Sequence, residues 1–119
     1  MSWRVVLGLL LVASVITACD QDPFGRSERV ISGNYRLKQW EDETYWVVSS
    51  RIDPIGPVIR LGWDAHRIIV EEQADDNVHW FKVVDTESNT VSAPLAELGP
   101  EVKTIALITA EQVWAKLAR

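Results

Sequence analysis

The sequence predicts an α+β fold, an antiparallel β-sheet meander with a C-terminal helix packed on it. Three observations support this class. Short runs of aromatic and β-branched residues alternate with turn residues between positions 35 and 93, as expected of strands joined by tight turns. A capping-box pattern begins at Thr109, and apolar residues follow it at helical spacing. No repeat or second linker interrupts residues 34–119, so we expect them to form a single domain.

The first residues have the three-part plan of a secretory signal peptide. A positively charged start, residues 1–4, precedes an almost wholly apolar run over residues 5–16, and small side chains follow. A membrane-spanning helix needs about 17 to 25 apolar residues, and this run is shorter. We therefore expect residues 1–18 to be removed as a leader rather than to span a membrane.

The leader ends in Ile16-Thr17-Ala18-Cys19: an aliphatic residue, a hydroxyl residue, a small residue and a cysteine. This segment resembles the lipobox of bacterial lipoproteins. The resemblance implies that the sulfur of Cys19 receives a diacylglyceryl group and that the amine freed by cleavage is often acylated as well, as by palmitate. Two or more chains anchor a protein stably, because each buried CH₂ contributes about 0.8 kcal/mol. The alternative is an ordinary secreted protein whose leader ends near a buried cysteine.

Asp20, which follows the cysteine, refines the expected location. In enteric-type bacteria an aspartate here resembles the signal that keeps a lipoprotein on the inner membrane, whereas other bacteria read this position differently. We therefore expect a lipid-anchored protein on the extracytoplasmic side, on the inner membrane if the cell is Gram-negative. Cys19 is the only cysteine, which excludes an internal disulfide and a thiolate metal cluster.

The charge balance argues against nucleic acid as a partner. The chain has 12 Lys and Arg against 17 Asp and Glu, and its formal net charge is −5. The leader contains one of these basic residues, Arg4, so the rest of the chain is more acidic still. An acidic surface without a basic cluster repels phosphate backbones and anionic headgroups. The expected partners are therefore the membrane, through lipid on Cys19, and another protein of the envelope.

The segment after the lipobox is expected to be a tether. Residues 19–33 are mostly polar, contain Pro23 and Gly25, and show no period of helix or strand. A flexible chain of this kind has an end-to-end distance of roughly 20 Å. We therefore expect the domain to lie close to the bilayer.

The domain itself is predicted to consist of short strands and one helix. The strands are expected at residues 35–40, 44–50, 57–63, 66–72, 78–85 and 90–93. The segment 53–57 contains two prolines and a glycine and is interpreted as a turn. The helix is expected to begin after Thr109, with Gln112 completing the capping box and Val113, Trp114 and Leu117 on its buried face.

The two histidines suggest a metal or catalytic site, with Asp64 and Glu71 nearby, because imidazole and carboxylate are common zinc ligands. The predicted hairpin argues against such a site. If residues 74–76 form its tip, His79 lies opposite Glu71 or its neighbour, and His66 lies four or five residues further along. At about 3.3 Å per residue this separation exceeds roughly 13 Å. We therefore expect no metal, no cofactor and no catalytic residue.

Carboxylates are concentrated around the tip of the same hairpin. Glu71 and Glu72 precede it, and Asp75-Asp76-Asn77 forms it. These oxygen ligands lack the spacing and the glycine of a known calcium loop. We interpret them as a solvated hairpin tip whose charge discourages pairing with other sheets.

Two tryptophans follow or precede another aromatic residue. Trp46 follows Tyr45, and Trp80 precedes Phe81. Successive residues of a strand point to opposite faces, so one ring of each pair is exposed unless both faces are covered. The candidate interaction surface therefore comprises Trp46, Trp80, Glu71 and Asp75.

We expect a membrane-anchored interaction or structural module of the cell envelope rather than an enzyme. The mature domain resembles small uncharacterised bacterial lipoproteins, a resemblance that transfers no site residues. Two alternatives stay open: a small envelope hydrolase or metal-binding enzyme that uses Asp64, His66 or His79, and a protein that binds a small ligand. An interaction module should display an aromatic or apolar patch, whereas the alternatives need a concave pocket.

Overall fold

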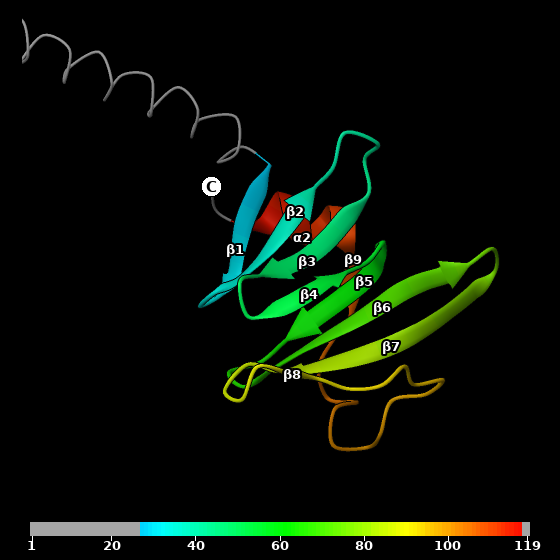
Figure 1. Cartoon of the computed structure of the whole chain (residues 1–119). Helices are drawn as coiled ribbons and strands as arrows, with labels where there is room; N and C mark the ends of the chain where they lie inside the picture. Colours follow the sequence, from blue (N-terminus) through cyan, green and yellow to red (C-terminus); the bar gives the residue numbers. More distant parts are fainter. Residues whose placement is uncertain (1–26, 118–119) are drawn as a thin grey trace, which may run out of the picture.

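Residues 27–117 are described by the computed structural model of the chain, and they confirm the α+β class (Figure 1). Antiparallel strands make up most of the structure, and a short helix lies at its C-terminal end. The strands form two sheets, whereas the sequence predicted one. Within each sheet most neighbours are consecutive in the chain, because short turns connect them.

The first sheet has the order β1-β2-β3-β4. Its strands are β1 (Glu28–Ser32), β2 (Tyr35–Gln39), β3 (Tyr45–Ser49) and β4 (Ile52–Ile55). The prediction that the tether extends to residue 33 is wrong for β1, which pairs with β2 in antiparallel register. The turn predicted at residues 53–57 is likewise replaced in part by β4, an edge strand that accommodates Pro54 because its outer side needs no backbone donor.

The second sheet has the order β8-β7-β6-β5-β9. Its strands are β5 (Val58–Trp63), β6 (Arg67–Asp75), β7 (Val78–Asp85), β8 (Thr90–Val91) and β9 (Ile108–Thr109). The bounds of β7 match the prediction, and the other predicted strands shift by a few residues at their ends. Strand β9 was not predicted, and it returns from far along the chain to pair with β5.

Helix α2 (Ala110–Lys116) begins where the sequence predicted it. The side chain of Thr109 accepts a hydrogen bond from the amide of Gln112, and the side chain of Gln112 accepts one from the amide of Thr109. This capping box satisfies two amides that the first helical turn leaves open. The buried face of the helix contains Ala110 and Val113.

One apolar core joins both sheets and the helix. Its buried members are Ile31, Tyr35, Leu37, Tyr45, Val47, Ile55, Val58, Leu61, Ile68, Val70, Val84, Ala110 and Val113. The alternate residues Ile68 and Val70 of β6 face this core, as the two-residue period of a strand requires. The core therefore lies between the sheets and fixes how they pack.

A long connection covers the opposite face of the second sheet. Leu95 pairs with Phe81 along the edge of β7, and Val102, further along the connection, is buried. Gly62 of β5 lies so close to this connection that a Cβ there would be 2.2 Å from the carbonyl oxygen of Ala106. Ile69, which points away from the main core, is fully buried as a result. Both faces of β6 are therefore covered.

The helical content of residues 27–117 includes no segment long and apolar enough to cross a membrane.

Candidate binding site

The predicted interaction surface separates into two regions in the structure. Trp46 lies on β3 of the first sheet, whereas Trp80, Glu71 and Asp75 lie on the β6–β7 hairpin of the second. Strand β6 runs further than predicted, because Asp75 pairs with Val78 and only two residues form the turn. The four residues therefore do not form one patch.

Glu72 of β6 is buried, accepts hydrogen bonds from two groups and forms an ion pair with a third. Its Oε1 atom lies 2.6 Å from Nε1 of Trp80 and 3.0 Å from the ammonium of Lys82. Its Oε2 atom lies 2.8 Å from the backbone amide of Gly56. A buried carboxylate is tolerated when it is paired in this way. Glu72 thus links the β4–β5 connection to the second sheet and forms a hydrogen bond with the indole N–H of Trp80.

Glu71 points to the other face of β6 and is also buried, with 7% of its surface exposed. Its Oε1 atom lies 2.5 Å from Nε of Arg60, and its Oε2 atom lies 3.4 Å from Nδ1 of His79. The interpretation of Glu71 and Glu72 as part of a solvated hairpin tip is therefore wrong. Asp75 is exposed beside the turn, as predicted, and its side chain accepts a hydrogen bond from the amide of Asp76.

The two histidines have separate partners. Nδ1 of His66 lies 2.6 Å from Glu87, and His79 contacts Glu71. His79 pairs with Gln73 in the β6–β7 ladder rather than with the residues predicted to lie opposite it. The cause is the length of β6, which continues to Asp75.

Asp64 has a local structural role. Its Oδ1 atom accepts hydrogen bonds from the amides of His66 and Arg67. The bond from His66 is the main reason that the pKa of Asp64 lies below its ordinary value. Among residues 27–117, no three His, Cys, Asp or Glu side chains are gathered as metal ligands would be.

The turn between strands β2 and β3, which Figure 1 shows, borders an aromatic hollow that we call the Trp40–Trp46 groove. Its volume is about 930 Å³. The groove is lined by Ser27, Lys38, Gln39, Trp40, Glu41, Asp42, Thr44, Trp46 and Pro57. Trp40 is 47% exposed, an unusual state for so large an apolar side chain. The sequence pattern predicted Trp46 but not Trp40, for which the only signal is its position beside the acidic turn at residues 41–43.

The two indoles of the groove meet nearly at a right angle. Their ring centroids are 6.5 Å apart, and their planes are inclined by 75°. Lys38 of β2 lies directly opposite Trp46 in the ladder, and its ammonium lies 4.5 Å from the centroid of Trp40. The carbonyl of Ser27, just before β1, accepts a hydrogen bond from the amide of Gln39, so the start of the described chain lies at the groove.

Trp46 is held on two sides. Its Nε1 atom donates to the hydroxyl of Thr44 at 3.0 Å, and that hydroxyl donates to Oδ1 of Asp42 at 2.6 Å. The bond from the Thr44 hydroxyl is the main reason that the pKa of Asp42 lies below its ordinary value. On the other side, Gly56 lies against the ring, and a Cβ there would be 2.6 Å from Cδ2 of Trp46. The indole is therefore fixed before any ligand arrives.

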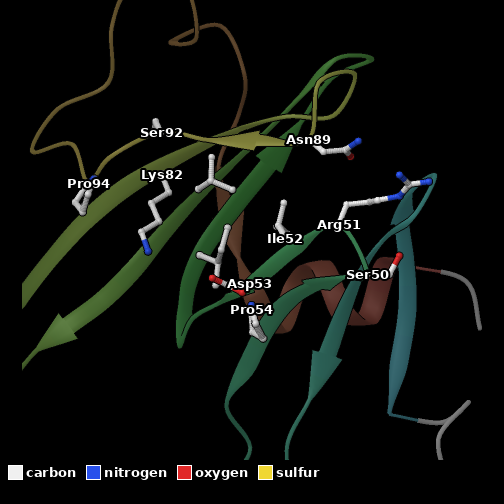
Figure 2. A pocket seen from close by; sticks show the side chains of 11 residues that line it. Ser50, Arg51, Ile52, Asp53, Pro54, Lys82, Asn89, Ser92 and Pro94 are labelled. Atoms are coloured by element: carbon white, nitrogen blue, oxygen red, sulfur yellow. The ribbon is translucent and has the colours of Figure 1, made fainter.

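A second hollow of about 560 Å³ lies between β4 and the strands β7 and β8 (Figure 2). Ile52 and Asp53 face Lys82 and Ser92 across it. Several of its polar groups already hold the fold together. Lys82 contacts Glu72, and the hydroxyl of Ser92 accepts a hydrogen bond from the amide of Val83. We therefore regard the Trp40–Trp46 groove, which contains a half-exposed indole, as the candidate binding site.

Two predicted site residues, Cys19 and Asp20, lie outside the described residues. Comparison of the chain with known proteins gives no matching family model, no matching curated protein and no matching solved structure.

Proposed function

We propose that the protein is a lipid-anchored binding module of the bacterial envelope. In this proposal the lipid on Cys19 holds it at the membrane, and the Trp40–Trp46 groove receives a segment of another envelope protein. The observation that carries the proposal is the half-exposed indole of Trp40 beside the fixed indole of Trp46. Tryptophan is enriched among the residues that dominate protein–protein binding energy.

The fixed geometry of the groove supports a binding role. The Asp42–Thr44–Trp46 hydrogen-bond chain and the contact with Gly56 hold the Trp46 ring in one orientation. A side chain that is ordered before binding loses little conformational entropy when a partner arrives. The groove therefore offers a rigid apolar wall beside polar groups that can orient a ligand.

The anchor is tested by labelling growing cells with an alkyne-bearing fatty acid. We expect the label and the membrane association to be present in the native protein and absent in Cys19→Ser. Ser2→Ala, a change within the leader, is the matched control and should leave both unchanged. Labelling of Cys19→Ser at the native level would overturn the assignment of the lipid to this cysteine.

The binding surface is tested by photo-crosslinking in cells, with a photoreactive amino acid at position 41 and, as the control site, at position 76. Glu41 lines the groove, and Asp76 is exposed in the β6–β7 turn. We expect a discrete crosslinked partner from position 41 only. Adding Trp40→Ala should abolish this product, whereas Val78→Ala, which removes an equally exposed apolar side chain, should preserve it. A product that survives Trp40→Ala would contradict the groove as the binding site.

A further inference from the structure

The chemistry of the groove narrows the kind of ligand it fits. Two indoles that meet at 75° present no single flat platform for a planar ring. They form a corner in which a compact group can contact two aromatic surfaces at once. Ammonium and guanidinium groups are attracted to indole faces by the ring quadrupole, and aromatic cages bind such cations.

The charges that line the groove have the sign that such a ligand requires. Glu41 and Asp42 line it, and neither forms an ion pair within residues 27–117. Aspartate is ionised at neutral pH, and the hydrogen bonds from Thr44 lower the pKa of Asp42 further. Lys38 is the one cation among the lining residues, and its ammonium lies 4.0 Å from the carboxylate of Glu28. The groove therefore has a surplus of negative charge.

A contact between a cation and an indole of the groove is present within the protein. The ammonium of Lys38 already lies 4.5 Å from the centroid of Trp40, so this indole accepts a cation in the folded protein. The volume of about 930 Å³ exceeds that of one side chain and leaves space for backbone on either side.

We propose that the Trp40–Trp46 groove binds an arginine or lysine side chain on an extended segment of its partner protein. The inference rests on the function proposed above and names the chemistry of the bound segment. The indoles contact the cationic group, and the carboxylates of Glu41 and Asp42 provide its counter-charge. The side chain of Gln39 lies within the same lining, where its Nε2 atom donates a hydrogen bond to the hydroxyl of Tyr45 at 3.2 Å.

The test uses the purified full-length protein in a nonionic polyoxyethylene detergent, which contains neither an amine nor a sugar. The probes are blocked pentapeptides with glycine at four positions and arginine, citrulline or glutamate at the centre. Binding is followed by the indole ¹⁵N–¹H signals of Trp40 and Trp46, assigned with Trp→Phe variants. We expect the arginine peptide to shift both signals and to bind at least about threefold more tightly than the citrulline peptide.

Charge variants separate a specific cation site from general attraction to an acidic protein. Glu41→Gln removes a lining carboxylate for which the structure shows no hydrogen bond within residues 27–117, and it should weaken binding of the arginine peptide about twofold or more. Asp76→Asn makes the same change in net charge at the β6–β7 turn and should leave the affinity unchanged. Equal losses in both variants would overturn the proposal.

Ligands of other chemistry test whether the groove selects a cation on a peptide. Equal binding of the citrulline and arginine peptides, or preferential binding of N-acetylglucosamine oligomers, would show that the groove does not select a cation. Stronger competition by phosphocholine than by the arginine peptide would assign the site to a lipid headgroup instead. In these cases the crosslink from position 41 still reports whether the groove contacts a protein, so the two proposals fail separately.

Discussion

Two pairs of adjacent aromatic residues that look alike in the sequence differ in burial in the structure. In the pair Tyr45 and Trp46, the tyrosine is buried in the core and the tryptophan lines an open groove. In the pair Trp80 and Phe81, both rings are half-buried, and the indole donates to buried Glu72. The difference arises because, within residues 27–117, the long connection after β8 covers the outer face of the second sheet, on which Phe81 lies. Adjacent aromatic residues in a strand therefore indicate that the rings lie on opposite faces of the sheet, but not which face is exposed.

The largest expected effect follows from Glu72→Ala. This change removes the hydrogen-bond acceptor of the Trp80 indole and the Gly56 amide, and the ion-pair partner of Lys82. Removing one partner of a buried charged network costs about 3–5 kcal/mol of unfolding free energy. Urea denaturation of the purified protein measures the loss, and a value below about 1 kcal/mol would show that Trp80 does not depend on its carboxylate.

Glu71→Ala removes the matching carboxylate from the opposite face of the same strand. The partners of Glu71 are Arg60 and His79, whose side chains are 43% and 47% exposed. These groups can turn to water when the carboxylate is lost, so Glu71→Ala should cost less than half as much as Glu72→Ala. A cost equal to that of Glu72→Ala would mean that burial of the carboxylate alone, and not its partners, sets the effect.

The next largest effect is expected from Gly56→Ala. The added methyl carbon would lie 2.6 Å from the Trp46 ring and 2.9 Å from the carbonyl oxygen of Tyr45. Overpacking of this kind costs about 1–3 kcal/mol. It should also displace the Trp46 indole signal in an NMR spectrum. Ser50→Ala, at an exposed position, is the control and should change the unfolding free energy by less than about 0.5 kcal/mol.

A smaller effect is expected from Thr44→Ala, which breaks the chain from Asp42 to Trp46. The loss of these hydrogen bonds should cost about 1 kcal/mol, because a typical intramolecular bond contributes 0.5–1.5 kcal/mol. Thr44→Ser retains the hydroxyl and should recover most of the stability. Denaturation curves report the stability, and equal losses in the two variants would attribute the effect to the methyl group instead.

The smallest effect on stability is expected from Trp40→Ala. Trp40 is 47% exposed and is absent from the buried core, so its removal should change the unfolding free energy by less than about 1 kcal/mol. The same variant should abolish binding in the groove. Thermal unfolding and the peptide titration, made on one preparation, separate the two effects. A large loss of stability would place Trp40 in the fold rather than at a binding surface.

Local signals in the sequence predicted local structure well. The capping box at Thr109 and Gln112 located the helix, because its hydrogen bonds involve residues only three apart. The run of aromatic and β-branched residues over 78–85 predicted the bounds of β7. The strands that were missed lack such a signal: β1 is short and mixed in character, β4 contains Pro54, and β9 exists only because it meets β5.

The division into two sheets and the burial of Glu71 and Glu72 depend on distant partners. Glu72 is neutralised by groups from β7 and from the β4–β5 connection, and Glu71 is paired with Arg60 of β5. Spacing along the chain does not reveal such partners, so a charged pair near a turn was interpreted as solvated. For the same reason the sequence predicted one of the two indoles of the groove. Trp46 follows another aromatic residue in a strand, whereas the exposure of Trp40 depends on how the turn between β2 and β3 folds.

The hydrogen bond from the amide of Gln39 to the carbonyl of Ser27 holds Ser27 at the rim of the groove. With the anchor at Cys19 as proposed, eight peptide units separate the lipid from the rim of the groove. At no more than about 3.5 Å each, they span at most about 28 Å. The length of this attachment then limits the height at which the groove can bind, because a cationic segment further from the bilayer cannot be contacted. The groove would thus select its partner by distance from the membrane as well as by charge.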